Sequence, residues 1–202
     1  MKRQNTILWI LGIVLLFLLP GAGIVAVTLT IKSRADFVKA MKDAVKRWLL
    51  ANEKTLENDP ARRDTVASIV AAQAALECGY GSTKAFKEGW NFGNVAKGSS
   101  WKGPTIQGGD KEYSKDGSEV KNITQQWRKY DSLDHAVADF FKVIGPKSRY
   151  AEAYNSLLDG DYNLYAYYLR NPVDGKGGYY TAPLADYQGG IKSRLAVTQG
   201  VA

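Results

Sequence analysis

An uncharged, mostly apolar run from Ile7 to Ile31 divides the chain into two unequal parts. The run exceeds the roughly 20 residues that a helix needs to cross a bilayer, so we expect a transmembrane signal anchor at 7–31 after a short tail at 1–6. Basic residues stand on both sides of it, so the charge pattern leaves its orientation open. A cleaved secretory signal peptide is the alternative, although the apolar character continues past the usual length of such a segment.

The rest of the 202-residue chain is long enough for one domain. The whole chain has 27 basic and 20 acidic residues and a net charge of +7, an excess that suits an anionic polymer as partner. A single cysteine, Cys78, excludes an internal disulfide, and a single histidine, His135, argues against a histidine-based metal site. We therefore expect neither a metal nor a cofactor, and we interpret His135 as structural.

Helix signals recur along this part of the chain. Ser33 is a capping residue before a helix to about residue 52, with apolar side chains on one face. Asp59-Pro60 predicts the start of a second, almost wholly apolar helix that ends at Glu77, where Gly79 stops it. Further helices are expected at 132–144, 148–158, 162–170 and 184–197.

Between residues 91 and 130 the pattern changes to short β-prone runs separated by glycines. Residues 115–118, Lys-Asp-Gly-Ser, predict the turn of a hairpin. The order of helices, a small β lobe and more helices predicts an α+β fold that is mainly helical. Asp131, Asp134 and Asp139, at and after the start of the helix expected from Ser132, are expected to face solvent rather than to bind a metal.

Glu77 is the most informative candidate for chemistry. It ends an apolar helix, where the helix dipole disfavours a carboxylate, and burial beside an aromatic ring such as Tyr80 would raise its pKa further. A carboxyl group that stays protonated near neutral pH is what a general acid for glycoside cleavage requires. A glutamate that points into solvent from the last helical turn is the alternative.

Several blocks in a fixed order resemble bacterial endo-β-N-acetylglucosaminidases of the autolysin and flagellar-hydrolase type, glycoside hydrolase family 73. Residues 72–82, Ala-Gln-Ala-Ala-Leu-Glu-Cys-Gly-Tyr-Gly-Ser, resemble that family's A-Q-A-A-L-E-S-G-W-G-x-S. The other matching blocks are Asn91-Phe92-Gly93, Lys111-Glu112-Tyr113, Trp127-Arg128-Lys129-Tyr130, Arg149-Tyr150 and Gly178-Tyr179-Tyr180-Thr181-Ala182-Pro183. The resemblance implies a lysozyme-like fold with a β-hairpin lobe over a glycan groove, with residues 32–58 as first helix and connector and 59–202 as catalytic domain.

The resemblance also implies roles for individual residues. Glu77 would be the proton donor, and Glu112 on the hairpin is the candidate second carboxylate, which would activate water or stabilise an oxocarbenium-like state. A glutamate that faces solvent from the strand, and assistance by the N-acetyl group of the substrate, are the alternatives. Tyr179 would hydrogen-bond the sugar or the catalytic carboxyl. The residues expected to line the sugar-binding groove are Tyr80, Asn91, Phe92, Trp101, Tyr113 and Tyr180.

Three positions depart from the family pattern. Cys78 replaces a serine, Ala182 replaces an aspartate, and Asn94 stands where the family continues with Ile-Lys. The first is a small change, whereas the second removes a carboxylate and the third predicts an altered loop at the groove.

The sequence therefore predicts a membrane-anchored peptidoglycan hydrolase, a glucosaminidase-like enzyme that binds glycan strands. It would be anchored in the lipid bilayer through residues 7–31 and would bind no nucleic acid. Its catalytic domain would face the cell wall, in a cell or in the membrane of a phage particle. A muramidase or lytic transglycosylase on the same fold, and a non-catalytic wall-binding protein, are the alternatives. The sequence makes no prediction of oligomeric state.

Overall fold

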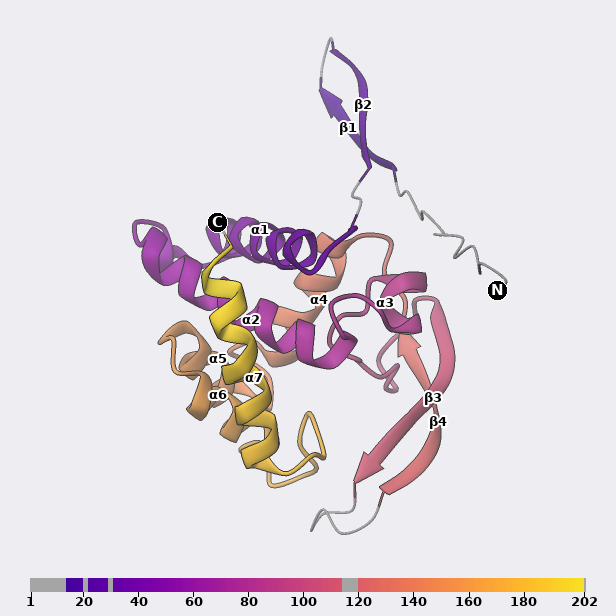
Figure 1. Cartoon of the computed structure of the whole chain (residues 1–202), viewed down its shortest axis with the longest axis vertical. Helices are drawn as coiled ribbons and strands as arrows, with labels where there is room; N and C mark the ends of the chain where they lie inside the picture. The colour runs from indigo at the N-terminus through magenta and orange to yellow at the C-terminus, as the bar shows by residue number, and fades with distance from the viewer. Residues whose placement is uncertain (1–13, 20–21, 29–30, 114–119, 202) are drawn as a thin grey trace, which may run out of the picture.

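The computed structural model describes the backbone of residues 14–19, 22–28, 31–113 and 120–201, and side chains from residue 31 onward except at 110–123. The expected mainly helical α+β fold is confirmed, with helices on one side and a two-stranded sheet at one end (Figure 1). Its elements after the amino-terminal segment are α1 (Arg34–Asn52), a 3-10 turn (Lys54–Leu56), α2 (Pro60–Cys78), α3 (Lys84–Gly89), β3 (Thr105–Tyr113), β4 (Val120–Arg128), α4 (Leu133–Ile144), α5 (Ala151–Leu158), α6 (Tyr162–Arg170) and α7 (Leu184–Gln199).

Helix α2 is the centre of the core. Asp59 accepts a hydrogen bond from the backbone of Arg62, Pro60 fills the first turn, and Gly79 ends the helix in the left-handed conformation, as the sequence predicts. Residues 66–75 of α2 are buried on every side. Helices α1 and α7 both pack against it. On α7, Gly190 allows the close approach, since a Cβ there would lie 2.9 Å from the side chain of Leu76.

Lys42 joins the first helix of the domain to the end of the last. It is 2% exposed, and its Nζ donates to the carbonyls of Thr198 (3.2 Å), in the last turn of α7, and Val201 (2.7 Å), just after it. A charged ammonium is well placed at the negative end of a helix dipole. The contact therefore fixes the carboxyl end of α7 against α1.

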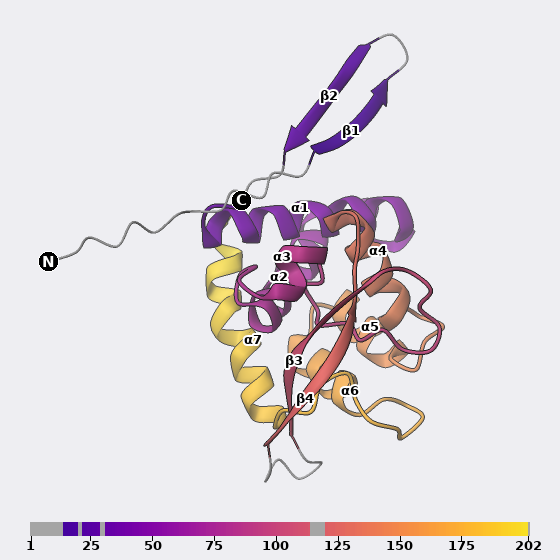
Figure 2. The same cartoon turned by 90° about the vertical axis from the view of Figure 1, so that its right-hand side faces the viewer.

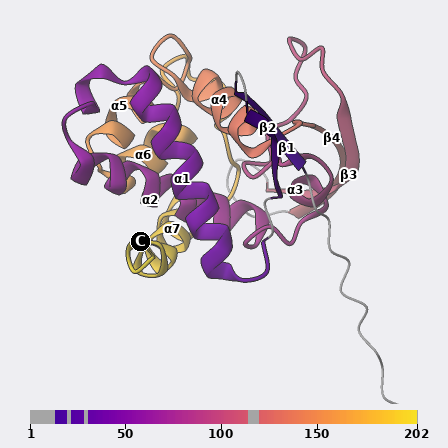
Figure 3. The same cartoon turned by 90° about the horizontal axis from the view of Figure 1, so that it is seen from above.

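Strands β3 and β4 form the antiparallel hairpin that the glycine-rich segment predicts, and they are longer than expected, pairing from Thr105 with Arg128 to Tyr113 with Val120. The predicted turn at 115–118 lies outside the described residues. Figure 3 shows this hairpin at the end of the domain opposite α5 and α6, and Figure 2 shows it arching across one face. The hairpin is thus a lobe attached to a helical body.

The expected transmembrane helix at 7–31 is wrong in the residues that the structure describes. They form an antiparallel hairpin of β1 (Val14–Leu19) and β2 (Ala22–Thr28), which projects beyond the start of α1 (Figure 1). Among the described residues, no helix has the length and apolar character needed to span a membrane. Pro20-Gly21 stands between the strands, and an apolar run with many Val and Ile residues fits a strand as well as a helix.

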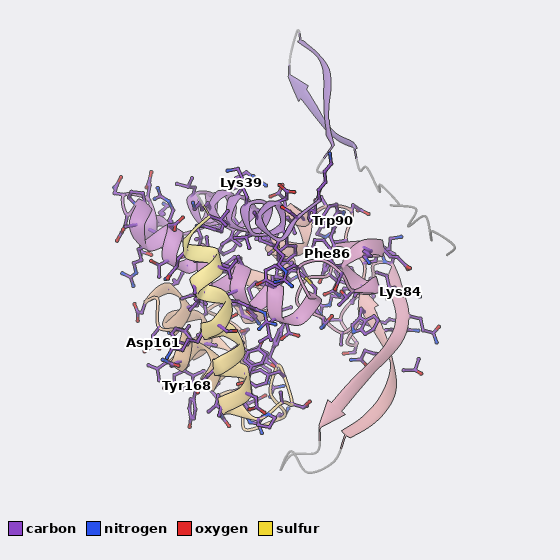
Figure 4. The ribbon with its side chains drawn as sticks, in the orientation of Figure 1. Lys39, Lys84, Phe86, Trp90, Asp161 and Tyr168 are labelled. Carbon is purple, nitrogen blue, oxygen red and sulfur yellow. The ribbon has the colours of Figure 1, made fainter. Side chains whose placement is uncertain are left out.

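Two further differences lie near the hairpin lobe. The short helix α3, which Thr83 caps, was not expected. Its Phe86 packs against Phe37 and Trp90, and Nζ of Lys84 donates to the backbone carbonyl of Gln107 in β3 at 3.0 Å. Figure 4 labels Lys84, Phe86 and Trp90 in this segment. The expectation that Asp139 faces solvent is also wrong. Asp139 is 8% exposed, because it accepts hydrogen bonds from Arg128 and Tyr130 in the wall beside the sheet.

Candidate active site

A cavity of about 870 Å³ lies between the helical body and the hairpin lobe. That volume is within the range of small-molecule and glycan sites. Its walls come from the end of α2, the loop 93–100, the end of β4, the start of α5 and the loop 178–182. Tyrosines 150, 179, 180 and 187 give it flat apolar surfaces beside polar groups, a combination suited to a sugar ring.

Glu77 lies in this cavity, half-buried in the last turn of α2. Both carboxylate oxygens accept hydrogen bonds. The hydroxyl of Tyr187 donates to Oε1 at 2.7 Å, and Nδ2 of Asn94 donates to Oε2 at 3.2 Å. The solvent-facing alternative for Glu77 is therefore excluded, because two neighbouring segments hold its carboxylate in place.

Tyr187 is in the first turn of α7, where it is 5% exposed. Tyr180 stacks on it with 3.6 Å between the ring centroids and 8° between the planes. Burial, and then the negative charge of Glu77, raise the pKa of Tyr187 well above its usual range. Tyr187 therefore keeps its hydroxyl proton and remains a donor to Glu77 over the whole physiological range of pH.

Asn94 reaches Glu77 from the loop after α3. Its backbone has a φ of 49°, in the left-handed region that asparagine tolerates better than other non-glycine residues. Its side chain also donates to the backbone carbonyl of Glu77 at 3.0 Å, in the last turn of α2. The departure from the family pattern at this position thus places an amide directly against the candidate acid.

Tyr179 and Tyr180 both line the cavity. The hydroxyl of Tyr179 donates to the carbonyl of Gly93 at 2.8 Å, and a Cβ on Gly93 would lie 2.5 Å from that hydroxyl. Tyr179 therefore joins the loop 178–182 to the loop that carries Asn94. Tyr180 donates to the carbonyl of Ala166 at 2.9 Å.

Four other predicted groove residues are not among those that line the cavity. Asn91 is fully buried, and its amide bonds the backbone of Val95 and Arg128, while Phe92 packs on the core. Tyr80 packs edge-on against Phe37, and Trp101 lies under Arg128 and donates to a neighbouring carbonyl. These four side chains contact the core and neighbouring loops, and none of them lines the cavity.

Glu112, the second candidate carboxylate, belongs to the hairpin lobe. Glu112 and Tyr113 lie at the far end of β3, opposite Lys121 and Val120, and their side chains are outside the described residues. Among the described residues that line the cavity, Glu77 is the one carboxylate. The cations there are Arg128 and Arg149, which are paired with Asp139 and Asp174.

Other candidate chemistry is weak at this site. Burial raises the pKa of Cys78 to about 12, so the thiol that replaces the family's serine is no nucleophile at neutral pH. No group of three or more potential metal-ligating side chains occurs in the described part of the chain. At Ala182, the backbone carbonyl accepts from Arg170, so the loop is tied down without the aspartate that the family has there.

Sequence reasoning missed Tyr187 as a site residue. Its signal was present, because Tyr187, Ile191 and Leu195 form the buried stripe of α7, and a buried tyrosine requires a partner for its hydroxyl. Gln73, a polar residue one turn before Glu77 within the buried part of α2, was a second such signal.

A family model described as mannosyl-glycoprotein endo-beta-N-acetylglucosaminidase, the glucosaminidase family, matches residues 54–193. The peptidoglycan hydrolase FlgJ of Salmonella typhimurium is 32% identical over 87 residues, which are 41% of this chain and 27% of FlgJ, so the chain spans about a quarter of that relative.

Solved structures agree with this match. A peptidoglycan hydrolase mutant from Sphingomonas sp. A1 superposes with a TM-score of 0.58 and 25% identity, over 83% of this chain and 97% of the other. The truncated glycoside hydrolase domain of Salmonella typhimurium FlgJ has a TM-score of 0.54 at 21% identity, over 84% and 100% of the two chains, and shows the fold alone. With a family match over most of its length and a carboxylate held in a sugar-sized cavity, the chain belongs to the glucosaminidase family of glycoside hydrolases.

Proposed function

We propose that this protein is an endo-β-N-acetylglucosaminidase that cleaves β-1,4 bonds in the glycan strand of peptidoglycan, with Glu77 as general acid. The observation that carries the proposal is the Glu77 carboxylate, fixed on both oxygens at the wall of an 870 Å³ cavity. The relatives that are named peptidoglycan hydrolases support the choice of substrate. The net charge of +7 suits an anionic wall polymer.

In this mechanism protonated Glu77 gives its proton to the glycosidic oxygen as the bond to the anomeric carbon breaks. The bonding electrons stay on the leaving oxygen, and the sugar develops oxocarbenium character. Water then adds to the anomeric carbon and loses a proton. Glu112 as base and assistance by the N-acetyl group of the substrate are two routes for this second half, and they stay open.

The bond that is cleaved follows from the products. Purified peptidoglycan is digested with the full chain, and the soluble fragments are analysed by mass spectrometry. A reducing N-acetylglucosamine end is the expected result. A reducing N-acetylmuramic acid end would replace the proposal with a muramidase, an anhydro end would replace it with a lytic transglycosylase, and no release of fragments would favour a wall-binding protein.

We also propose that the domain acts on the wall-facing side of a membrane, in a cell or a phage particle. This proposal rests on the chosen substrate and on the uncharged sequence of residues 7–31. Amino-terminal sequencing of the native protein tests it together with membrane fractionation. Retention of Met1 in the membrane fraction supports attachment through this segment, whereas a start in the twenties and a soluble secreted protein would contradict attachment but not the location. Full-length protein confined to the cytosolic fraction would contradict the proposed location.

A further inference from the structure

A chain of buried hydrogen bonds runs through the helical body to Glu77. Tyr165 of α6 donates its hydroxyl to Oε1 of Gln73, Nε2 of Gln73 donates to the hydroxyl oxygen of Tyr187 at 3.1 Å, and Tyr187 donates to Glu77. Tyr165 and Gln73 are 0% and 1% exposed. One residue from each of three helices, Gln73 of α2, Tyr165 of α6 and Tyr187 of α7, thus forms a polar path that leads to Glu77.

The donors in this chain point in one direction. A phenol carries one hydrogen, so a tyrosine that accepts from an amide must direct its own hydrogen elsewhere. Tyr165 fixes the amide of Gln73 with its oxygen turned away from Tyr187. The amide nitrogen of Gln73 therefore donates a hydrogen bond to the hydroxyl oxygen of Tyr187, and the hydroxyl hydrogen of Tyr187 is directed to Oε1 of Glu77.

Asn94 donates to the other carboxylate oxygen, Oε2, from a different segment of the chain. It also ties the backbone at residue 77 to the loop 93–95, so the position of the carboxylate depends on that loop. With one donor on each oxygen, the plane and the rotamer of the Glu77 side chain are defined before any substrate binds.

We infer that Tyr187, oriented by Gln73 and Tyr165, and Asn94 are positioning residues that hold Glu77 in place for proton transfer. This inference rests on the proposed function. Among the described residues, burial together with the negative charge of Glu77 raises the pKa values of Cys78, Tyr165, Tyr179, Tyr180 and Tyr187, and the described cations that line the same cavity are Arg128 and Arg149. Because burial and the charge of Glu77 raise the pKa values of Tyr165 and Tyr187, these two hydroxyls stay protonated throughout the range of the test.

The test is the pH dependence of the initial rate on soluble peptidoglycan fragments, measured for the full chain carrying Tyr187→Phe or Asn94→Gly. Glycine at residue 94 removes the amide and keeps the left-handed backbone free of strain. Each variant should lower kcat by about tenfold to a hundredfold with KM unchanged, because the acid is misplaced while the sugar contacts remain. The alkaline limb of the profile should move to higher pH by about one unit, since the ionised carboxylate loses one hydrogen bond.

Two further variants separate positioning from a general loss of packing. Tyr165→Phe does not touch Glu77, and it should move the alkaline limb in the same direction by a smaller amount. Tyr154→Phe is the matched control, because Tyr154 donates to Glu53 far from the cavity, and it should lower thermal stability without moving the limb.

Unchanged kcat and an unmoved limb in folded Tyr187→Phe and Asn94→Gly, with Glu77→Gln inactive, would overturn this inference and leave the proposed function standing. An equal shift in Tyr154→Phe would overturn it as well. Activity in Glu77→Gln would instead remove the proposed function. Should Tyr187→Phe fail to fold, as judged by circular dichroism, Asn94→Gly in its half-buried loop decides the outcome.

Discussion

Replacement of Asp139 by asparagine tests how the hairpin lobe is joined to the helical body. Asp139 and Arg128 are 8% and 13% exposed at their side chains, with 2.7 Å between Nη1 and Oδ2, and Tyr130 donates to the same oxygen at 2.8 Å. Arg128 also donates through Nε to the carbonyl of Ala96 at 3.1 Å. The pair thus links α4, the end of β4 and the loop that borders the cavity.

Asp139→Asn keeps the shape and an acceptor oxygen but leaves the guanidinium of Arg128 without its counter-charge. Breaking a buried ion pair costs about 3–5 kcal/mol, and we expect the lower end, about 3 kcal/mol, because the amide oxygen still accepts a hydrogen bond. For a chain of this size that loss lowers the midpoint of thermal unfolding by about 6–12 °C.

The control is Asp134→Asn on the same helix. Asp134 and Arg47 form an exposed pair, with side chains 45% and 59% exposed, and such pairs contribute at most about 1 kcal/mol. Urea unfolding and calorimetry of the two variants give the comparison. Equal midpoints for Asp139→Asn and Asp134→Asn would refute the reasoning that burial makes the Arg128 pair essential.

Two other perturbations follow from the same structure. Lys42→Met should cost about 2 kcal/mol in urea unfolding, because it leaves two carbonyls at the end of α7 without a donor, while Lys39→Met in an exposed pair should change little. Burial alone would raise the pKa of Asp64, but hydrogen bonds from Lys46 and Lys42 lower it. The contribution of Asp64 to the stability of the fold is therefore complete above about pH 4 and is lost as the pH falls further. Lys42→Met should weaken this acid dependence, and an unchanged pH–stability curve would contradict the assignment. Gly93→Ala should reduce activity by at least about tenfold, with the fold intact by circular dichroism, because the new Cβ would lie 2.5 Å from the hydroxyl of Tyr179 and displace it. Full activity would show that the loop around Gly93 adapts to the methyl group.

Local signals were enough to place most of the helical body. Ser33, Asp59-Pro60 and Ser132 cap helices where the sequence predicts them, since a side-chain acceptor at the first turn is a local property. Apolar character alone did not distinguish helix from strand before residue 31. A short run of Val, Ile and Leu fits either, and Pro20-Gly21 was a turn signal as much as a helix kink.

The site itself divides along the same line. Glu77, Tyr179 and Tyr180 were found from a linear pattern, and all three line the cavity. Tyr187 was not identified and Asp139 was expected in solvent, because the partner of each lies on another element. Only the packing of α7 on α2 and of β4 on α4 brings these partners together. A polar residue within the apolar stripe of a helix is the sequence signal here, because a buried polar side chain requires a hydrogen-bond partner on a neighbouring element.

The central claim is that Glu77 supplies the proton for glycan cleavage, and a single substitution tests it most directly. Glu77→Gln has nearly the same shape but no acidic proton, and Glu88→Gln, at an exposed position on α3, is the matched control. Release of reducing ends from purified peptidoglycan is measured for both full-length variants after circular dichroism shows that they fold. The account predicts a loss of at least about a hundredfold for Glu77→Gln and an unchanged rate for Glu88→Gln. A folded Glu77→Gln variant that releases reducing ends at the unmodified rate would contradict it.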